Sequence, residues 1–241
     1  MADLEIPELA IAIAAQKHNP TVLNAEFLVY NEIVPGDWAP SEDRFSTPVY
    51  SQVDYEEQGI SIICQPDKVV FTRTNGDIRS SSEPDVAALA TAYVTALPHV
   101  QYKDVAVMID GHVVVEGGMQ EARRQVIDNY VAKGPWCEYG NGVDDAMVNL
   151  AYEIERSTLR MSIFPAFYLT QPEKGTGDNG EESQEEIPVI RYSASFSEEI
   201  EGEGREERIA NLIQRLGRWR EWLESYLELV EQKLMVQSVN G

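Results

Sequence analysis

The sequence predicts an α+β fold, in which a largely antiparallel sheet carries helices packed on one of its faces. Three observations lead to this prediction. Strand-like and helix-like segments follow one another in the order strands, helix, strands, helix. Short segments rich in β-branched residues are separated by turn dipeptides, which is typical of an antiparallel meander. The C-terminal segment 205–236 has the apolar periodicity of one long amphipathic helix.

The first segment, residues 6–17, is predicted to be a short helix. Pro7 stands at a plausible first helical position, where its missing N–H has no consequence. The alternation of Leu9, Ile11 and Ile13 also fits a strand, so that alternative stays open.

Residues 21–34 are rich in β-branched and aromatic side chains and are predicted to form a strand. Three prolines make residues 35–48 a loop. The segments 49–57, 59–65 and 68–74 are predicted to be short strands, because Gln-Gly and Pro-Asp dipeptides separate them. Together they predict a meander.

Two further helices are predicted. Residues 80–100 carry one apolar stripe at helical spacing, and Ser82 is a plausible N-cap. Residues 119–133 form the second helix, ended by a Gly-Pro pair. Between them, residues 103–118 are predicted to be a hairpin, since two β-rich runs flank Asp110-Gly111.

The second half repeats the theme with predicted strands at 146–156, 158–170 and 187–200. Residues 172–186 are expected to be a flexible acidic insert, because their composition cannot bury enough apolar surface to offset the cost of ordering.

The chain is predicted to be a single globular domain, 1–241. A division into two similar strand-rich halves, 1–133 and 143–241, is kept as an alternative, since short strand segments in the two halves resemble one another. Such likeness also arises by chance among strands.

Charge is the unusual bulk property. The chain has 41 acidic and 19 basic residues, which give a formal net charge of −22. Such a field repels phosphate backbones and anionic lipid, so direct binding to nucleic acid or to a membrane is not expected. Three interpretations stay open: solubility, docking onto a basic partner surface, and imitation of nucleic acid.

The location is expected to be cytoplasmic. The early apolar runs are far shorter than the ~20 residues that a membrane-spanning helix needs. Asp3 and Glu5 stand where a signal peptide would be basic. Two widely separated cysteines, Cys64 and Cys137, suggest neither a disulfide framework nor a zinc motif. Cys64 lies within a predicted strand and is expected in the core.

Residues 175–180, Gly-Thr-Gly-Asp-Asn-Gly, match the letters of the dinucleotide-binding motif G-x-G-x-x-G. A working motif opens a helix whose N-terminus binds the pyrophosphate. Here four glutamates and another predicted strand follow instead. We interpret the match as an accident of composition.

Asp110 and His112 are the one candidate metal pair, since residues i and i+2 of a strand face the same way. No third ligand is nearby, and the Asp-Gly turn explains Asp110 without a metal. His18 and His99 each follow a predicted helix and have no evident partner. Acidic neighbours would raise the pKa of the Cys137 thiol, which disfavours a nucleophile. No catalytic, cofactor-binding or metal-binding residue is therefore predicted.

Three stretches carry a resemblance: LNAEFLVYNEIVP at 23–35, ISIICQPDKVVFT at 60–72 and LPHVQYKDVAV at 97–107. Their combination resembles a sporadically distributed, uncharacterised bacterial protein family of cyanobacterial type. The resemblance covers about the first half of the chain. It implies a bacterial cytoplasmic origin and no particular chemistry.

The leading hypothesis is a non-enzymatic acidic interaction protein: an adaptor, assembly factor or accessory subunit of a larger bacterial complex. Its partner would be a protein with a basic surface, or a second copy of the chain. An inhibitor that imitates nucleic acid is the first alternative. A small-ligand-binding domain or enzyme is the second, and it would require an apolar pocket with convergent polar groups.

The C-terminal helix supplies the candidate partner-binding residues. Its apolar side chains spread far around the helix, and two tryptophans three residues apart resemble interface anchors. The predicted contact residues are Trp219, Trp222, Leu223, Tyr226, Leu229 and Val230. The alternative is that this wide stripe simply covers the sheet.

Overall fold

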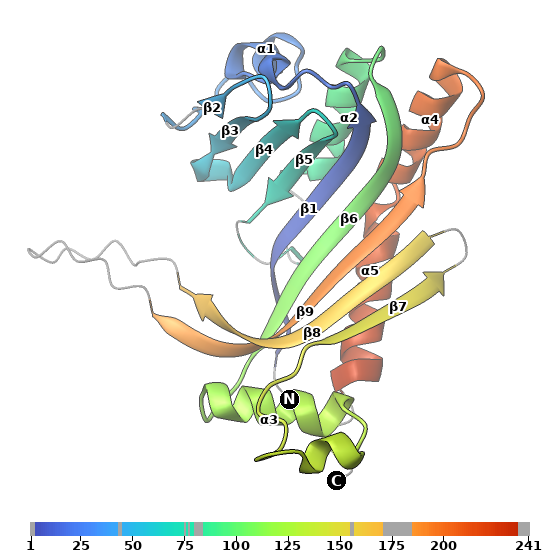
Figure 1. Ribbon diagram of the computed structural model, residues 1–241. Coiled ribbons are helices and arrows are strands. Elements are labelled where there is room, and N and C mark those ends of the chain that lie inside the picture. The colour runs from blue at the N-terminus through green and yellow to red at the C-terminus, as the bar shows by residue number, and fades with distance from the viewer. Residues whose placement is uncertain are drawn as a thin grey trace, which may run out of the picture.

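A nine-stranded antiparallel sheet runs through the described part of the computed structural model (Figure 1). The structure describes residues 3–42, 45–74, 76, 78–79, 84–154, 157–170 and 185–235. The strands stand in the order β2-β3-β4-β5-β1-β6-β9-β8-β7. Their bounds are β1 Glu5–Gln16, β2 Phe45–Ser46, β3 Ser51–Tyr55, β4 Ile60–Gln65, β5 Lys68–Arg73, β6 Gln101–Val114, β7 Val148–Ile154, β8 Ser157–Leu169 and β9 Glu186–Glu199.

The helices gather on one side of this sheet. Figure 1 shows α2, α4 and α5 behind the strands, and α3 below them, where it contacts β8 and β9. This arrangement confirms the predicted α+β fold. None of the described helices is long and apolar enough to cross a membrane. The bounds are α1 Ala25–Tyr30, α2 Val86–Ala96, α3 Met119–Tyr130, α4 Arg205–Leu216 and α5 Trp219–Leu229, with short 3-10 turns at Pro20–Val22, Glu56–Gln58 and Pro135–Glu138.

Two neighbouring rows of side chains show how differently the two faces are covered. Because successive residues of a strand point to opposite faces, each row belongs to one face. The row beneath the helices is almost entirely buried and reads Val53, Ile62, Phe71, Ile11, Val107, Phe196, Leu159 and Tyr152. The row on the other face, hereafter the open face, is half-buried or exposed and reads Gln52, Ile63, Val70, Ala12, Ala106, Ser197, Thr158 and Glu153.

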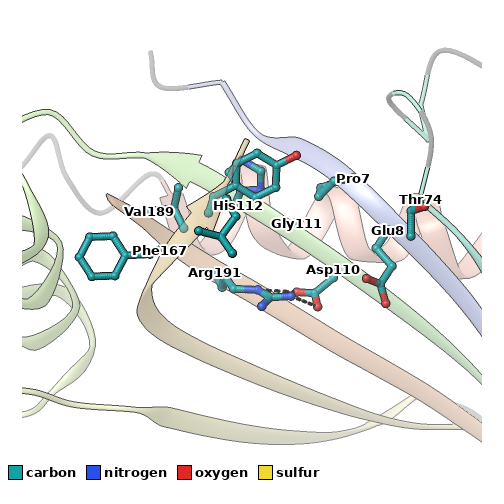
Figure 2. A pocket seen from close by; sticks show the side chains of 11 residues that line it. Pro7, Glu8, Thr74, Asp110, Gly111, His112, Phe167, Val189 and Arg191 are labelled. Atoms are coloured by element: carbon teal, nitrogen blue, oxygen red, sulfur yellow. Dashed lines mark hydrogen bonds and ion pairs between the residues drawn. The ribbon is translucent and has the colours of Figure 1, made fainter. Parts of the chain in front are cut away.

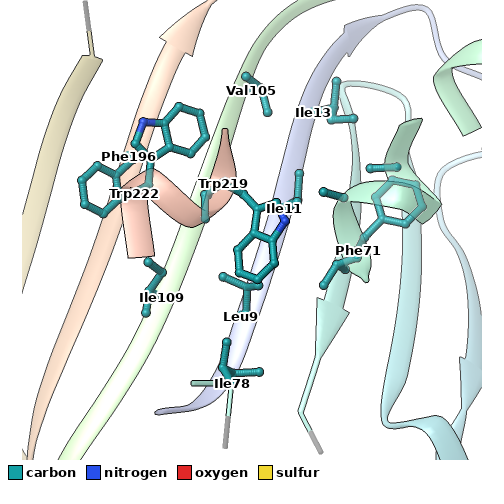
Figure 3. Close-up of a cluster of buried hydrophobic side chains, with 14 of the residues drawn as sticks. Leu9, Ile11, Ile13, Phe71, Ile78, Val105, Ile109, Phe196, Trp219 and Trp222 are labelled. Atoms are coloured by element: carbon teal, nitrogen blue, oxygen red, sulfur yellow. The ribbon is translucent and has the colours of Figure 1, made fainter. Parts of the chain in front are cut away.

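The core lies between the sheet and the helices that cover it, and Figure 3 shows the part that contains Trp219 and Trp222 of α5. Leu9 and Ile11 of β1 are fully buried there, together with Trp219 of α5. The indole of Trp222 stacks on Phe196 of β9 with ring centroids 6.2 Å apart. The broad apolar stripe of the C-terminal segment therefore has a place within the chain's own fold.

The helix predicted at 6–17 is wrong, and the alternative strand is correct. These residues form β1, a twelve-residue strand in the middle of the sheet. The alternation of buried Leu9, Ile11 and Ile13 decides the structure, because it matches the two-residue period of a strand that packs one face on a core. Pro7 lies where the register with β6 shifts, which is a bulge that tolerates its missing N–H.

The strand predicted at 21–34 is also wrong. A 3-10 turn and α1 occupy this segment. The side chain of Asn24 accepts a hydrogen bond of 2.8 Å from the backbone N–H of Phe27 and so caps α1. This capping signal outweighs the β-branched composition.

The hairpin predicted around Asp110-Gly111 is wrong as well. β6 continues through both residues and pairs with β9 on its far side without interruption. Gly111 is needed here for space, since a Cβ at this position would lie 2.3 Å from the hydroxyl oxygen of Tyr226. That hydroxyl donates a 2.8 Å hydrogen bond to the backbone carbonyl of Tyr192.

The C-terminal helix is not continuous. α4 ends at Leu216, Gly217 caps it, and α5 begins at Trp219. Beyond α5 the chain makes a π-helical turn, Val230–Leu234.

Other predicted elements are present with shifted ends. β3, β4, β5, α2, α3, β7, β8 and β9 lie within or close to the predicted segments. Asp85 is the N-cap of α2, accepting from the backbone N–H of Ala87 at 2.9 Å. The predicted cap Ser82, the glycine motif 175–180 and most of the insert 172–186 lie outside the described residues; Glu186 begins β9.

A buried polar cluster joins α2, β4 and the loop after β1. The Sγ atom of Cys64 lies 3.2 Å from Nδ1 of His18, and the hydroxyl of Tyr93 lies 2.9 Å from Nε2. Burial, with a smaller contribution from the charge of His99, lowers the pKa of His18 to about 4. Burial also raises the pKa of Cys64 to about 12, so this cluster is uncharged at neutral pH.

This cluster predicts a loss of stability in mild acid. The folded pKa of His18 lies below the ordinary value of 6.5, so the unfolded chain binds the proton more readily as pH falls through this window. Between pH 6.5 and 4, the wild type should lose about 3 kcal/mol more unfolding free energy than His18→Gln. Urea unfolding at several pH values measures this difference. His99→Gln is the control: it removes only the smaller contribution to the His18 pKa, so its pH dependence should stay close to that of the wild type. Parallel curves for wild type and His18→Gln would contradict the prediction.

Gly111→Ala is expected to destabilise the fold by about 1–3 kcal/mol, because the added methyl group meets the Tyr226 hydroxyl. In a Tyr226→Phe background the same substitution should cost clearly less, since the clashing oxygen is absent. Thermal unfolding of the two single variants and the double variant measures this coupling. Simple additivity would show that the contact does not constrain Gly111.

Candidate functional site

A hollow of about 330 Å³ lies at one end of the open face (Figure 2). Residues from β1, β6, β8 and β9 line it, together with Thr74 after β5. We call it the Asp110 hollow and define it by Glu8, Asp110, His112, Tyr168 and Arg191.

The strand register brings these side chains together. Glu8 is opposite Asp110, and Glu5 is opposite His112, so β1 spans three residues where β6 spans two. Glu8 begins the regular register that runs to Ala14, so strand alternation alone places it on the open face opposite Asp110. The bulge at Pro7 brings Glu5, rather than Ile6, opposite His112. Arg191 of β9 is directly opposite His112 and completes the group.

Asp110 and Arg191 form the ion pair of the hollow. The Nε atom of Arg191 donates to Oδ1 of Asp110 at 3.2 Å, and its Nη2 donates to Oδ2 (Figure 2). A guanidinium that bonds both oxygens of one carboxylate is held in a fixed orientation. The Arg191 guanidinium therefore serves mainly as the partner of Asp110.

Glu8 lacks such a partner. In the described part of the chain it forms no hydrogen bond and no ion pair, although its side chain is half-buried. Burial, followed by repulsion from Asp110, raises the pKa of the Glu8 carboxyl; attraction to Arg191 offsets this in part. An added positive charge in the hollow would stabilise the ionised form of Glu8 and so lower its pKa.

His112 forms the wall of the hollow. Its residue is only 3% exposed, and its ring stacks on Tyr168 with centroids 4.3 Å apart. Its Nε2 lies 3.5 Å from Oε2 of Glu5 and makes no hydrogen bond within the described structure. Burial lowers the pKa of His112 and outweighs the carboxylate of Glu5, so the neutral imidazole is favoured.

The predicted geometry of the Asp110 and His112 pair is present, but for a different reason. Both lie on one face of a continuous strand, whereas the turn that seemed to explain Asp110 does not exist. Asp110 is bound to Arg191. Among the described residues, no group of three or more His, Cys, Asp or Glu side chains is arranged to hold a metal ion.

The same strand carries a second acidic pair at its other end. Asp104 of β6 is directly opposite Glu199 of β9. Burial and then repulsion from Glu199 raise the pKa of Asp104. Like charges directly opposite one another destabilise a sheet. The open face therefore has a cross-strand carboxylate pair at each end of β6.

A larger hollow of about 640 Å³ lies beside Cys137, between the end of α3 and residues 134–143. Its polar lining is Asp128, Lys133 and Glu138. No described hydrogen bond or ion pair joins these three side chains. This hollow has volume, but its polar groups are not organised with respect to one another.

The predicted partner-binding residues mostly lie inside the protein. Trp219, Trp222, Leu223, Tyr226 and Val230 are buried, and only Leu229 of the six is half-buried. The alternative interpretation, that the stripe covers the sheet, accounts for the five buried side chains. Each of these five residues is at most 8% exposed.

Glu8 and Arg191 were not among the residues predicted from the sequence. Within a strand, Glu8 and Arg191 are charged positions on the face opposite the buried ones. Pro7 suggests a helix, whereas the alternation of residues 5–16 indicates a strand. In that strand Glu8 lies on the face opposite the apolar residues Leu9 and Ile11.

Comparisons with known proteins add no family. No protein-family model matches this chain, and the curated proteins include no significant match to its sequence.

Glu8→Gln is expected to raise the melting temperature at neutral pH. The folded pKa of Glu8 is raised, so its ionised form lowers stability at neutral pH, and this penalty disappears as pH falls through the raised pKa. Thermal unfolding should show a higher melting temperature for Glu8→Gln than for the wild type at neutral pH, and a smaller difference at acidic pH. Glu224→Gln on the exposed side of α5 is the matched control and should leave the melting temperature unchanged. A fall in the melting temperature of Glu8→Gln at neutral pH would contradict the claim that ionised Glu8 lowers stability.

Proposed function

We propose that this protein is a non-enzymatic acidic interaction protein of the bacterial cytoplasm, acting as an adaptor, assembly factor or accessory subunit of a larger complex. Its open face binds a basic segment of a protein partner. The two cross-strand carboxylate pairs on β6 are the observation that carries this proposal.

Each pair costs stability in the isolated protein. Glu8 lies beside Asp110, and Asp104 lies beside Glu199, and in both places the ionised form is disfavoured. Asp110 is already paired with Arg191, so the lysine or arginine side chains of a partner would neutralise Glu8 and Asp104 and recover the lost stability as binding free energy. Asp104 and Asp110 are six residues apart on one strand, which corresponds to roughly 20 Å.

The residues between the two pairs suit an extended partner segment. Ala106 and Met108 of β6 and Ser195 and Ser197 of β9 are half-buried and carry no charge. The short side chains of Ala106, Ser195 and Ser197 leave the sheet surface accessible between the acidic ends. The net charge of −22 adds long-range attraction for a basic partner.

The nucleic-acid mimic is retained as a second candidate because these carboxylates lie on strands. Imitation of a phosphate backbone requires negative charges held on rigid elements, and Glu8, Asp104 and Asp110 meet that requirement. The two candidates differ in the partner. A mimic binds a protein whose own ligand is DNA or RNA, and that ligand competes with it.

Affinity purification tests the proposal. The wild type, a Glu8→Gln/Asp104→Asn variant and a Glu224→Gln/Glu228→Gln control are used as bait at low and moderate salt. We expect one set of proteins on the wild type and the control at low salt. The same proteins should be lost at moderate salt and absent from the first variant, because screening and neutralisation remove the same attraction.

Retention of those proteins by all three baits would contradict the proposal. Circular dichroism and thermal unfolding serve as folding controls, since the first variant is expected to be at least as stable as the wild type. Addition of duplex DNA or RNA to the eluted complex separates the candidates: displacement of the partner supports the mimic.

A further inference from the structure

β7 forms one edge of the sheet, and its outer side is unpaired among the described residues. It pairs only with β8, from Val148 opposite Ile163 to Ile154 opposite Ser157. No described loop forms a backbone hydrogen bond with β7. Its outward N–H and C=O groups are therefore available to another strand.

This edge also lacks the usual protection against pairing. Residues 148–154, Val-Asn-Leu-Ala-Tyr-Glu-Ile, contain no proline and no lysine, and their register with β8 is unbroken. Natural edge strands are commonly short, bulged, covered or rich in lysine. The opposite edge of the sheet follows that rule, since β2 has only two residues.

The sequence of β7 is complementary to itself. Consider an antiparallel pair of two copies with a two-fold axis at Ala151. Ala151 then faces Ala151 of the other copy, and the numbers of any two residues that face each other add up to 302. Leu150 then meets Tyr152, Val148 meets Ile154, and Asn149 meets Glu153 of the other copy. Apolar side chains face apolar ones, and the single carboxylate faces an amide that can donate to it.

We propose that two copies of this chain associate through antiparallel pairing of their β7 strands about Ala151. This register overlaps all seven residues of each strand, and it keeps the helix-covered faces of the two sheets on the same side. The two sheets become one. The interaction is isologous, as in most soluble homodimers.

Apolar surface near this edge supports the pairing. Val148, Leu150, Tyr152 and Ile154 are only half-buried on the side of the sheet that the helices cover. Met147, immediately before β7, is 59% exposed. A second copy would cover part of each of these side chains.

Net charge opposes the association, because two chains of −22 repel each other. A single strand pair also buries less than the ~1,000 Å² typical of stable interfaces. We therefore expect a reversible dimer that is promoted by protein concentration and by salt. Salt should promote this dimer, whereas it should weaken binding of a basic partner to the open face. The two associations can therefore be tested separately, and failure of one does not imply failure of the other.

Cysteine crosslinking tests the register. In a Cys137→Ser background, which leaves only the buried Cys64, Ala151→Cys places two thiols at the two-fold axis. Directly opposite residues of an antiparallel pair have Cα atoms about 4.5–5.5 Å apart, within the range of a disulfide. Asn149→Cys is the matched control on the same face of the same strand. In this register Asn149 faces Glu153 of the other copy, so the two introduced thiols would be about four residues apart and too distant to form a disulfide.

We expect mild oxidation to give a covalent dimer for Ala151→Cys and almost none for Asn149→Cys. Sedimentation velocity at raised salt should show a concentration-dependent dimer for the wild type. It should show only monomer for Ala151→Lys, which places two like charges opposite each other at an exposed position without altering the core. A wild type that stays monomeric at raised salt, equal crosslinking at both positions, or an undiminished dimer of Ala151→Lys would overturn the proposal.

Discussion

The unbroken course of β6 between β1 and β9 is the constraint on which the rest of this structure depends. β6 pairs with β1 along one side and with β9 along the other, and so joins the early strands to the late ones. β6 requires glycine at position 111 because Tyr226 of α5 fills the space that a side chain would need. Sheet and C-terminal helix are therefore fixed against each other at the same point.

The two sides of β6 have different roles. Val105, Val107 and Ile109 pack beneath the helices, while Asp104 and Asp110 lie on the open face near other carboxylates. A buried apolar face stabilises the fold enough for the opposite face to keep groups that lower stability. In our account, those acidic pairs are retained because a basic partner neutralises them.

Sequence patterns predicted elements where local signals agreed, as in the meander β3–β5 and in helices α2 and α3. They failed where a local signal conflicted with packing. Asp110-Gly111 has the composition of a turn, but a distant tyrosine determines the need for glycine. The alternation of residues 5–16 indicates the face on which Glu8 lies, but its position beside Asp110 depends on cross-strand register, which is not encoded in a short window of sequence. Similarly, neither the break at Gly217 nor the stacking of Trp222 on Phe196 was predicted from the apolar periodicity of residues 205–236.

Native-state hydrogen exchange of the backbone amides of β6 tests the central claim most directly. If β6 is a continuous interior strand, residues 104–114 should exchange slowly and through one common opening reaction whose free energy matches global unfolding. Amides of β1 and β9 opposite them should share that value. Rapid exchange at residues 110–112, or separate opening of the segments 1–133 and 143–241, would contradict the account.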